Sequence, residues 1–216
     1  MGKIKNTETK NLKLKAKKII KILDRLFPKS KIALNFSNPW ELVVAVILSA
    51  RNKDEAVNKV TEKLFKKYKT LDDYIKTGVE NFSKDINTLG LYKQKAKYII
   101  NAAKIIKEKY NGKIPKSIDE LTKLPGIGRK SANIIIWNIY KESPGIAVDT
   151  HVSRLARLFG LTKNTNPDKI EKDLMNIIPK ERWGDLPYKL IDYGRKYCKA
   201  NCKHSSCPLK NFIVKK

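Results

Sequence analysis

The sequence of 216 residues is short of cysteine, of acidic side chains and of long apolar runs. Its three cysteines all lie between Cys198 and Cys207, a cluster that suits metal ligation and not the disulfide framework of a secreted domain. The longest apolar run, Leu42 to Ala50, is far shorter than the ~20 residues of a membrane span. The polar, lysine-rich N-terminus lacks the apolar stretch of a secretory signal. We therefore expect an intracellular protein with no membrane partner.

Acidic residues are too few to balance the basic ones. The chain has 47 Lys and Arg against 21 Asp and Glu, which gives a formal net charge of +26. Such an excess repels itself in a compact protein, and an anionic partner would offset it. Nucleic acid is the usual partner of so basic a chain. A general preference for lysine in the source organism is the alternative explanation.

Apolar residues recur with the helical period along the chain, and no segment alternates in the manner of a strand. The sequence therefore predicts an all-α fold. Asn38 and Pro39 are expected to open an almost wholly apolar core helix that runs on through Glu41 to Ala50. Ser117 and Glu120 have the spacing of a capping box at the start of a short helix to Leu124. Only residues 1–9 are expected to be loose.

The most informative stretch lies between two predicted helices and contains Gly126, Ile127, Gly128, Arg129 and Lys130. Two glycines flank one aliphatic residue, so the turn can adopt positive φ and leave its backbone uncovered, while the aliphatic side chain enters the core. The backbone N–H groups of the turn and of the following helix would then face outward and bind phosphate without reading sequence. An ordinary turn between two helices is the plainer interpretation.

This stretch resembles the helix-hairpin-helix of the endonuclease III family of DNA glycosylases. Further segments match the family in order and spacing, so the resemblance covers about residues 30–210. The matching segments are LNFSNPWELVVAVILSA (34–50), VNKV (57–60), TLGLYKQKA (88–96), LPGIGRKSAN (124–133), GIAVDTHVSRLARLFG (145–160) and GRKYC (194–198).

The resemblance implies the helix-hairpin-helix glycosylase fold, with two helical domains and a DNA-binding cleft between them. It implies a central domain over 30–140 that ends in the helix-hairpin-helix (117–140). A basic segment and helix (1–29) would pack with a C-terminal domain (141–216) that holds the cysteine loop (198–207). The implied partner is double-stranded DNA with damaged bases or abasic sites. We expect a monomer in the cytoplasm or nucleoid.

The family's chemistry requires an amine that attacks the sugar C1′ of the damaged nucleotide, with a carboxylate nearby. The resemblance places the amine on Lys130 and the carboxylate on Asp149. It thereby implies a bifunctional enzyme, which removes a damaged base, expected to be an oxidised pyrimidine, and cuts the abasic site by β-elimination through a Schiff base. Without the resemblance, Lys130 would be one more phosphate contact and Asp149 a helix cap.

The target nucleotide must leave the duplex to reach such a site. By resemblance, Leu91 is a wedge that enters the base stack, and Arg51 stands where the family usually has a glutamine that fills the gap. Arginine is longer and charged, so this difference bears on substrate preference. A helix-end hydrophobe is the plainer interpretation of Leu91.

Many relatives hold a [4Fe–4S] cluster on four cysteines separated by six, two and five residues. Cys198 and Cys207 fit this pattern, but Cys202 comes too early and Ile213 occupies the fourth position. We therefore expect that the cluster is lost and that the chemistry requires no cofactor. Cys198, Cys202, His204 and Cys207 remain candidates for a residual metal site that could bind Zn²⁺ or an unusual cluster.

Two other functions stay open on the sequence alone. A non-catalytic helix-hairpin-helix protein would bind DNA without regard to damage, although the similarity outside the hairpin argues against it. A glycosylase of the same fold could instead remove uracil or thymine mismatched with guanine. An adenine-mismatch enzyme fits less well, because the chain keeps the lysine and has no extra recognition domain.

Overall fold

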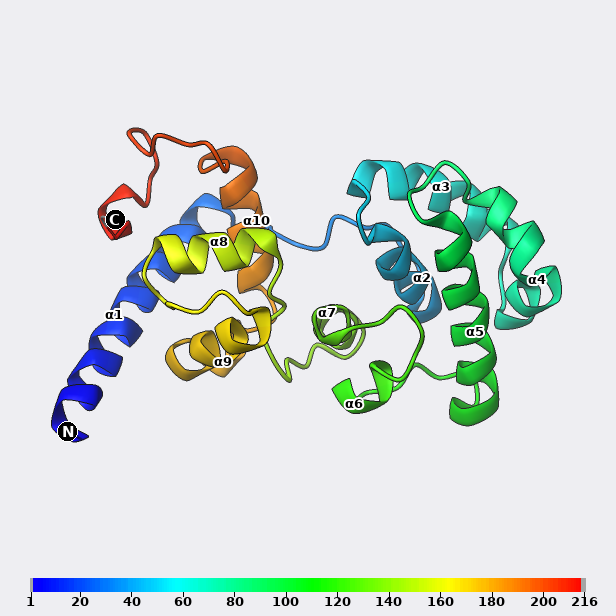
Figure 1. Ribbon diagram of the computed structural model, residues 1–216, viewed down its shortest axis with the longest axis horizontal. Helices are drawn as coiled ribbons and strands as arrows, with labels where there is room; N and C mark the ends of the chain where they lie inside the picture. The colour runs from blue at the N-terminus through cyan, green and yellow to red at the C-terminus, as the bar shows by residue number, and fades with distance from the viewer. Residues whose placement is uncertain (1, 215–216) are drawn as a thin grey trace. The chain divides into compact units, whose positions relative to one another are not determined.

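The computed structural model describes the backbone of residues 2–214 and the side chains of residues 7–214. Every regular element in residues 2–214 is a helix, which confirms the all-α prediction (Figure 1). The chain forms two units, which we call the central unit (Ala33–Lys141) and the terminal unit (Met1–Ile32 with Glu142–Lys216). Within the described residues, no helix is both long enough and apolar enough to span a membrane.

The central unit is built around α2, which contacts α3, α5 and α7. Asn38 accepts the backbone N–H of Glu41 at 3.0 Å and Pro39 is the first helical residue, as predicted. Every residue from Leu42 to Leu48 is buried, so this helix forms the middle of the core. The helices of this unit are α2 (Pro39–Ser49), α3 (Asp54–Lys67), α4 (Leu71–Asp85), α5 (Tyr92–Tyr110), α6 (Ile118–Leu121) and α7 (Arg129–Tyr140).

The short helix α6 opens as predicted and closes early. The Ser117 hydroxyl accepts the backbone N–H of Glu120 at 3.2 Å. The helix ends at Leu121, whereas the sequence predicts Leu124. The backbone N–H groups of Lys123 and Leu124 donate to carbonyl oxygens three residues back, so the chain tightens into turns before Pro125. Residues 122–128 form the turn that leads into α7, and α6 packs against α7.

The terminal unit joins the start of the chain to its end. The first helix, α1 (Gly2–Leu26), contacts α9 and α10, and α8 contacts the same two helices (Figure 1). The prediction that residues 1–9 are loose is wrong for residues 2–9: no proline or internal glycine interrupts their helix. Met1 lies outside the described residues. The other elements are α8 (Thr150–Leu158), α9 (Pro167–Ile177), η1 (Lys180–Arg182), α10 (Leu186–Lys196) and η2 (Lys210–Phe212).

Candidate active site

The hairpin turn between α6 and α7 keeps its two glycines for different reasons. Gly126 has φ 82°, and a Cβ there would lie 2.8 Å from Cδ2 of Tyr98. Gly128 has an extended backbone with φ −96°, so the expected positive φ applies to Gly126 alone. No heavy atom lies within 4 Å of the place where a Gly128 Cβ would stand, so its backbone is uncovered. Ile127 is buried, as predicted.

The N-terminus of α7 is open to an anion. Gly128 is the N-cap, and in the described part of the chain no side chain caps this helix. The first N–H groups of a helix have no partner within the helix and carry a partial positive charge. Arg129 and Lys130 are the first two helical residues, and both side chains are exposed. The turn thus combines uncovered backbone, a positive helix end and two cationic side chains.

Asp149 is the N-cap of α8 in the terminal unit. Its Oδ1 accepts the backbone N–H of Val152 at 2.8 Å, and its Oδ2 lies 3.5 Å from Nδ1 of His151. The side chain is 19% exposed, and only Oδ1 is hydrogen-bonded to the start of the helix. Asp149 therefore holds the start of α8 and also presents one carboxylate oxygen.

A close approach between α8 and α10 supports this end of the terminal unit. A Cβ on Gly194 would lie 2.7 Å from Cδ2 of His151 and 3.2 Å from Nη2 of Arg154. The same Arg154 nitrogen donates a hydrogen bond to the carbonyl oxygen of Cys198 at 2.6 Å. The helix that Asp149 caps is therefore tied to the first residue of the cysteine loop. Sequence reasoning missed Arg154, although it lies inside a matched segment.

Arg51 and Leu91 stand at two exposed turns of the central unit. Arg51 follows α2 with φ 58°, and Leu91 precedes α5 with φ 60°. Leu91 is 55% exposed. The left-handed conformation costs roughly 1–2 kcal/mol in a residue with a Cβ. Leu91 is the N-cap residue of α5 and presents an apolar side chain to solvent.

Two residues that sequence reasoning missed join these turns. The Asn52 Oδ1 accepts the backbone N–H of Gly90 at 2.9 Å, and its amide donates to the Leu48 carbonyl at 2.8 Å. The Lys95 ammonium is buried and donates to the carbonyl oxygens of Leu48 at 2.9 Å and Ala50 at 2.6 Å. Burial lowers the pKa of Lys95 to about 8. A lysine four residues before buried Ile99, on the apolar face of α5, was the available signal.

The cysteine loop brings four potential metal ligands together. One ligand atom from each of Cys198, Cys202, His204 and Cys207 lies within 4.8 Å of all the others. Burial raises the pKa of the Cys207 thiol to about 12, while the hydrogen bond with Cys207 lowers the pKa of Cys202. The prediction that the iron–sulfur site is lost is therefore wrong. That prediction was based on the family's spacing of four cysteines. In this loop, four ligands come together from other positions in the sequence.

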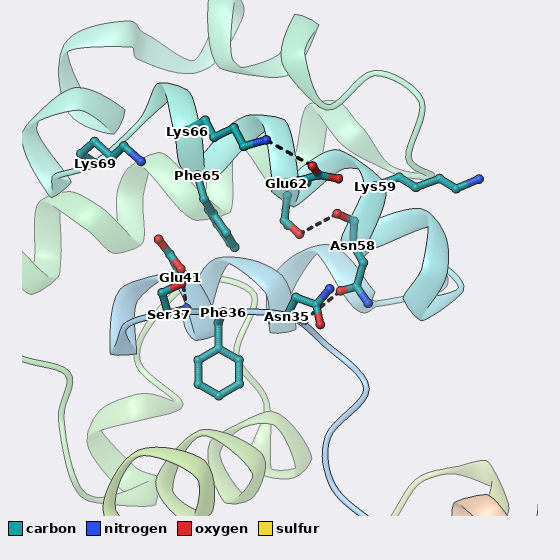
Figure 2. A pocket seen from close by; sticks show the side chains of 11 residues that line it. Asn35, Phe36, Ser37, Glu41, Asn58, Lys59, Glu62, Phe65, Lys66 and Lys69 are labelled. Carbon is teal, nitrogen blue, oxygen red and sulfur yellow. Dashed lines mark hydrogen bonds and ion pairs between the residues drawn. The ribbon is translucent and has the colours of Figure 1, made fainter.

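A separate pocket of about 440 Å³ lies between the start of α2 and α3 (Figure 2). Glu41 accepts the backbone N–H of Ser37 at 2.6 Å on one side, and Asn58 accepts that of Asn35 at 2.9 Å on the other. Its rim carries an ion pair between Lys66 and Glu62. None of the predicted site residues is among those that line it, and its mixed charges do not suit a polyanion.

Comparison with known proteins places this geometry in a family. Residues 44–180 match the model of the HhH-GPD superfamily base excision DNA repair protein. The chain is 44% identical to endonuclease III of Bacillus subtilis (strain 168) over 91% of each protein. It is 38% identical to endonuclease III of Thermotoga maritima, over 81% of this chain and 82% of that protein.

Solved structures agree in sequence and fold. A non-covalent endonuclease III–DNA complex superimposes with a TM-score of 0.88 at 41% identity, over 93% of this chain and 94% of that one. A trapped endonuclease III–DNA covalent intermediate gives the same TM-score and identity. This chain belongs to the endonuclease III family within the HhH-GPD superfamily. It is a DNA glycosylase and AP lyase of base excision repair, which confirms the predicted fold, function and DNA partner over the alternatives.

Proposed function

We propose that the enzyme removes oxidised pyrimidines from double-stranded DNA, with Lys130 as nucleophile and Asp149 as its carboxylate partner. One observation carries the proposal: Lys130 is an exposed lysine at the uncapped N-terminus of α7, beside the Gly126–Gly128 turn. A solved relative at 41% identity is a trapped covalent intermediate with DNA, and an attacking amine accounts for such a bond.

The Lys130 amine must lose its proton before it can attack. Its nitrogen then forms a bond to C1′ of the nucleotide, and the bond from C1′ to the base breaks, so that the base leaves with the electron pair and takes up a proton. Opening of the sugar ring gives a Schiff base between Lys130 and C1′. Loss of a C2′ proton expels the 3′ phosphate by β-elimination, and water then releases the lysine.

Asp149 serves the step in which charge develops on the sugar. Its Oδ1 accepts the backbone N–H of Val152 and its Oδ2 takes no part in this cap, so the carboxylate is fixed in orientation and keeps one oxygen for the reaction. A fixed anion stabilises the positive charge that forms on the sugar as the base departs, and can accept a proton from the amine.

The turns and the hairpin bind the DNA in this proposal. Uncovered N–H groups at Gly128 and the start of α7, with Arg129, contact phosphates without reading the sequence. Leu91 enters the base stack, and Arg51 fills the space left by the extruded nucleotide. Cys198, Cys202, His204 and Cys207 would hold a metal centre whose contribution is structural. Because relatives with this fold are solved in complex with DNA, we infer that the enzyme acts inside the cell, where DNA is found.

Borohydride trapping tests the proposal. Wild type, Lys130→Ala and the matched control Lys123→Ala, an exposed lysine in the same segment, are each mixed with duplexes containing thymine glycol, uracil opposite guanine, or a bare abasic site. We expect adducts with wild type and Lys123→Ala only, and faster trapping on thymine glycol than on uracil. Equal trapping by Lys130→Ala would exclude Lys130, and preference for uracil would make the enzyme a mismatch glycosylase.

A further inference from the structure

The loop after α10 contains a compact group of soft ligands. Cys202 Sγ lies 3.2 Å from Cys207 Sγ, and His204 Nδ1 lies 3.5 Å from Cys198 Sγ and 3.8 Å from Cys207 Sγ. All three cysteines are free of disulfides. Cys198 and Cys207 are buried in the core of the terminal unit, and Cys202 and His204 are half-buried beside them.

His204 is held toward the thiols by the backbone. It has φ 63°, a left-handed conformation that is uncommon in a residue with a side chain. Its own backbone N–H donates to Cys202 Sγ at 3.3 Å, and the ring nitrogen faces the other two sulfurs. The loop therefore adopts an unfavourable backbone conformation at His204, and this conformation places the imidazole among three sulfur atoms.

We propose that His204 is the fourth ligand of a Cys₃His metal centre formed with Cys198, Cys202 and Cys207. The position at which relatives have their last cysteine is Ile213, and this side chain packs against the apolar core of the terminal unit. In this proposal the His204 imidazole, which lies inside the loop, takes the place of the thiolate that relatives supply at position 213. The proposed ligand set contains neither of the residues proposed to act on the DNA, Lys130 and Asp149.

The ligand set selects a thiophilic metal group. Three thiolates and one imidazole suit Zn²⁺ or an iron–sulfur cluster, and do not suit Mg²⁺ or Ca²⁺. Tetrahedral Zn²⁺ with Zn–S bonds of about 2.3 Å separates its ligand atoms by about 3.8 Å, near the spacings in this loop. A [4Fe–4S] cluster takes one ligand on each iron, so the same four residues also supply the number of ligands that it needs.

The centre would stabilise the part of the terminal unit that carries Asp149. Arg154 of α8 donates to the Cys198 carbonyl at 2.6 Å, and its other terminal nitrogen lies 3.7 Å from Cys198 Sγ. A bound metal fixes Cys198 and so fixes this contact to α8. Loss of the metal should therefore lower the melting temperature of the protein.

Metal analysis of the full-length protein tests the proposal, with iron, zinc and acid-labile sulfide measured per chain after anaerobic purification. We compare wild type with His204→Ala, His204→Cys and Ser205→Ala, a matched control at an exposed neighbour in the loop. We expect one Zn²⁺ or one cluster per chain in wild type, Ser205→Ala and His204→Cys. His204→Ala should bind metal at least 10-fold more weakly, because the loss of a hydrogen-bonding partner of a ligand already costs about 10- to 100-fold in affinity. Its melting temperature should also be lower.

The zinc content and the iron and sulfide content distinguish a mononuclear zinc site from an iron–sulfur cluster. Iron with equal sulfide and visible absorbance identifies a cluster, and colourless protein with one zinc identifies a mononuclear site; either supports the proposal. A wild type that binds neither zinc nor reconstituted iron and sulfide overturns it, as does wild-type metal content in His204→Ala. If His204→Ala does not fold, X-ray absorption of the wild-type metal decides, because a first shell of sulfur without nitrogen excludes His204.

Discussion

The helices that carry Lys130 and Asp149 begin in opposite ways. The start of α7 is a bare Gly128 with no capping side chain in the described residues, whereas the start of α8 is capped by Asp149 itself through Val152. Lys130 therefore has no structural duty at its helix end, and Asp149 has one. A change at Lys130 should therefore affect the chemistry and not the start of its helix, whereas a change at Asp149 should affect both the chemistry and the stability of the fold.

The sharpest way to separate the two duties of Asp149 is the substitution Asp149→Asn. Asparagine caps a helix about as well as aspartate, so the melting temperature should not change. Loss of the charge should lower the single-turnover rate of strand cleavage by about 10²- to 10⁴-fold. The control Asp149→Ala should lose the same rate and also about 1 kcal/mol of stability. Near wild-type cleavage by Asp149→Asn would leave Asp149 as a cap only.

The two glycines before α7 should respond differently to alanine. Gly126→Ala should lower the free energy of unfolding by about 2 kcal/mol, because alanine is strained at φ 82° and its methyl group meets Tyr98. Gly128→Ala should cost less than about 1 kcal/mol, since nothing occupies the space beside it.

Gly128→Ala should bind DNA less well than the wild type. The methyl group of Gly128→Ala would cover backbone N–H groups that bind phosphate, so affinity for an abasic duplex should fall about tenfold, near the value of one hydrogen bond to a charged group. Denaturant titration and equilibrium binding at one salt concentration measure both effects. Unchanged affinity in Gly128→Ala would mean that phosphate does not approach this backbone.

Local signals explain how much could be predicted from the sequence. Asn38, Ser117 and Asp149 cap helices that begin one residue later, and each cap was readable from side-chain chemistry within a few residues. The burial of Ile127 followed in the same way from its place between two glycines. The family resemblance added Lys130 and Asp149 as a pair, which composition and periodicity do not connect.

Contacts between distant residues were not predictable by the same means. Lys95 meets the Leu48 carbonyl across 47 residues, and nothing local to either residue indicates the other. No prediction covers α4, where Gly78 with φ 73° interrupts the helical period. The prediction for the cysteine loop failed for a related reason. His204 reaches the thiols because its backbone is left-handed, and the spacing of the ligands in the sequence does not reveal that conformation.

Lys95 is a cation that, unlike Lys130, is buried and holds the fold together. Lys95→Met should lower the free energy of unfolding by about 2 kcal/mol at pH 7, because two carbonyl oxygens lose a charged donor. The folded-state pKa of Lys95, about 8, lies below its ordinary value of 10.5. Between these pH values the unfolded chain holds more protons, so wild type gains stability over the variant as pH rises.

Denaturant titrations at pH 7, 8, 9.5 and 10.5 measure this difference. The deficit of Lys95→Met should be constant below pH 8 and should grow above it, by up to about 3 kcal/mol at pH 10.5. Lys97→Met, at an exposed neighbour in the same helix, is the control and should show no such growth. A deficit that is independent of pH would mean that Lys95 keeps its proton in the folded protein.

A small effect is expected at Asp24, a carboxylate of the terminal unit that is the N-cap of no helix. The Arg182 guanidinium donates to it at 2.6 and 2.9 Å, and Lys189 also contacts it. Hydrogen bonding to Arg182 lowers the pKa of Asp24 to about 2, against the opposing effect of burial. This depressed pKa stabilises the fold above the ordinary value of 3.8, and the contribution is lost as pH falls through 2.

Asp24→Asn should therefore destabilise the protein at pH 7 and match wild type near pH 2. The loss at pH 7 should be only about 1 kcal/mol, because Asp24 is 38% exposed and water screens the pair. Melting curves at pH 7, 4 and 2 follow the difference, and cleavage of an abasic duplex at pH 7 should be unchanged. Reduced cleavage by Asp24→Asn at equal folded fraction would show that carboxylates of the terminal unit act on the DNA more widely than through Asp149.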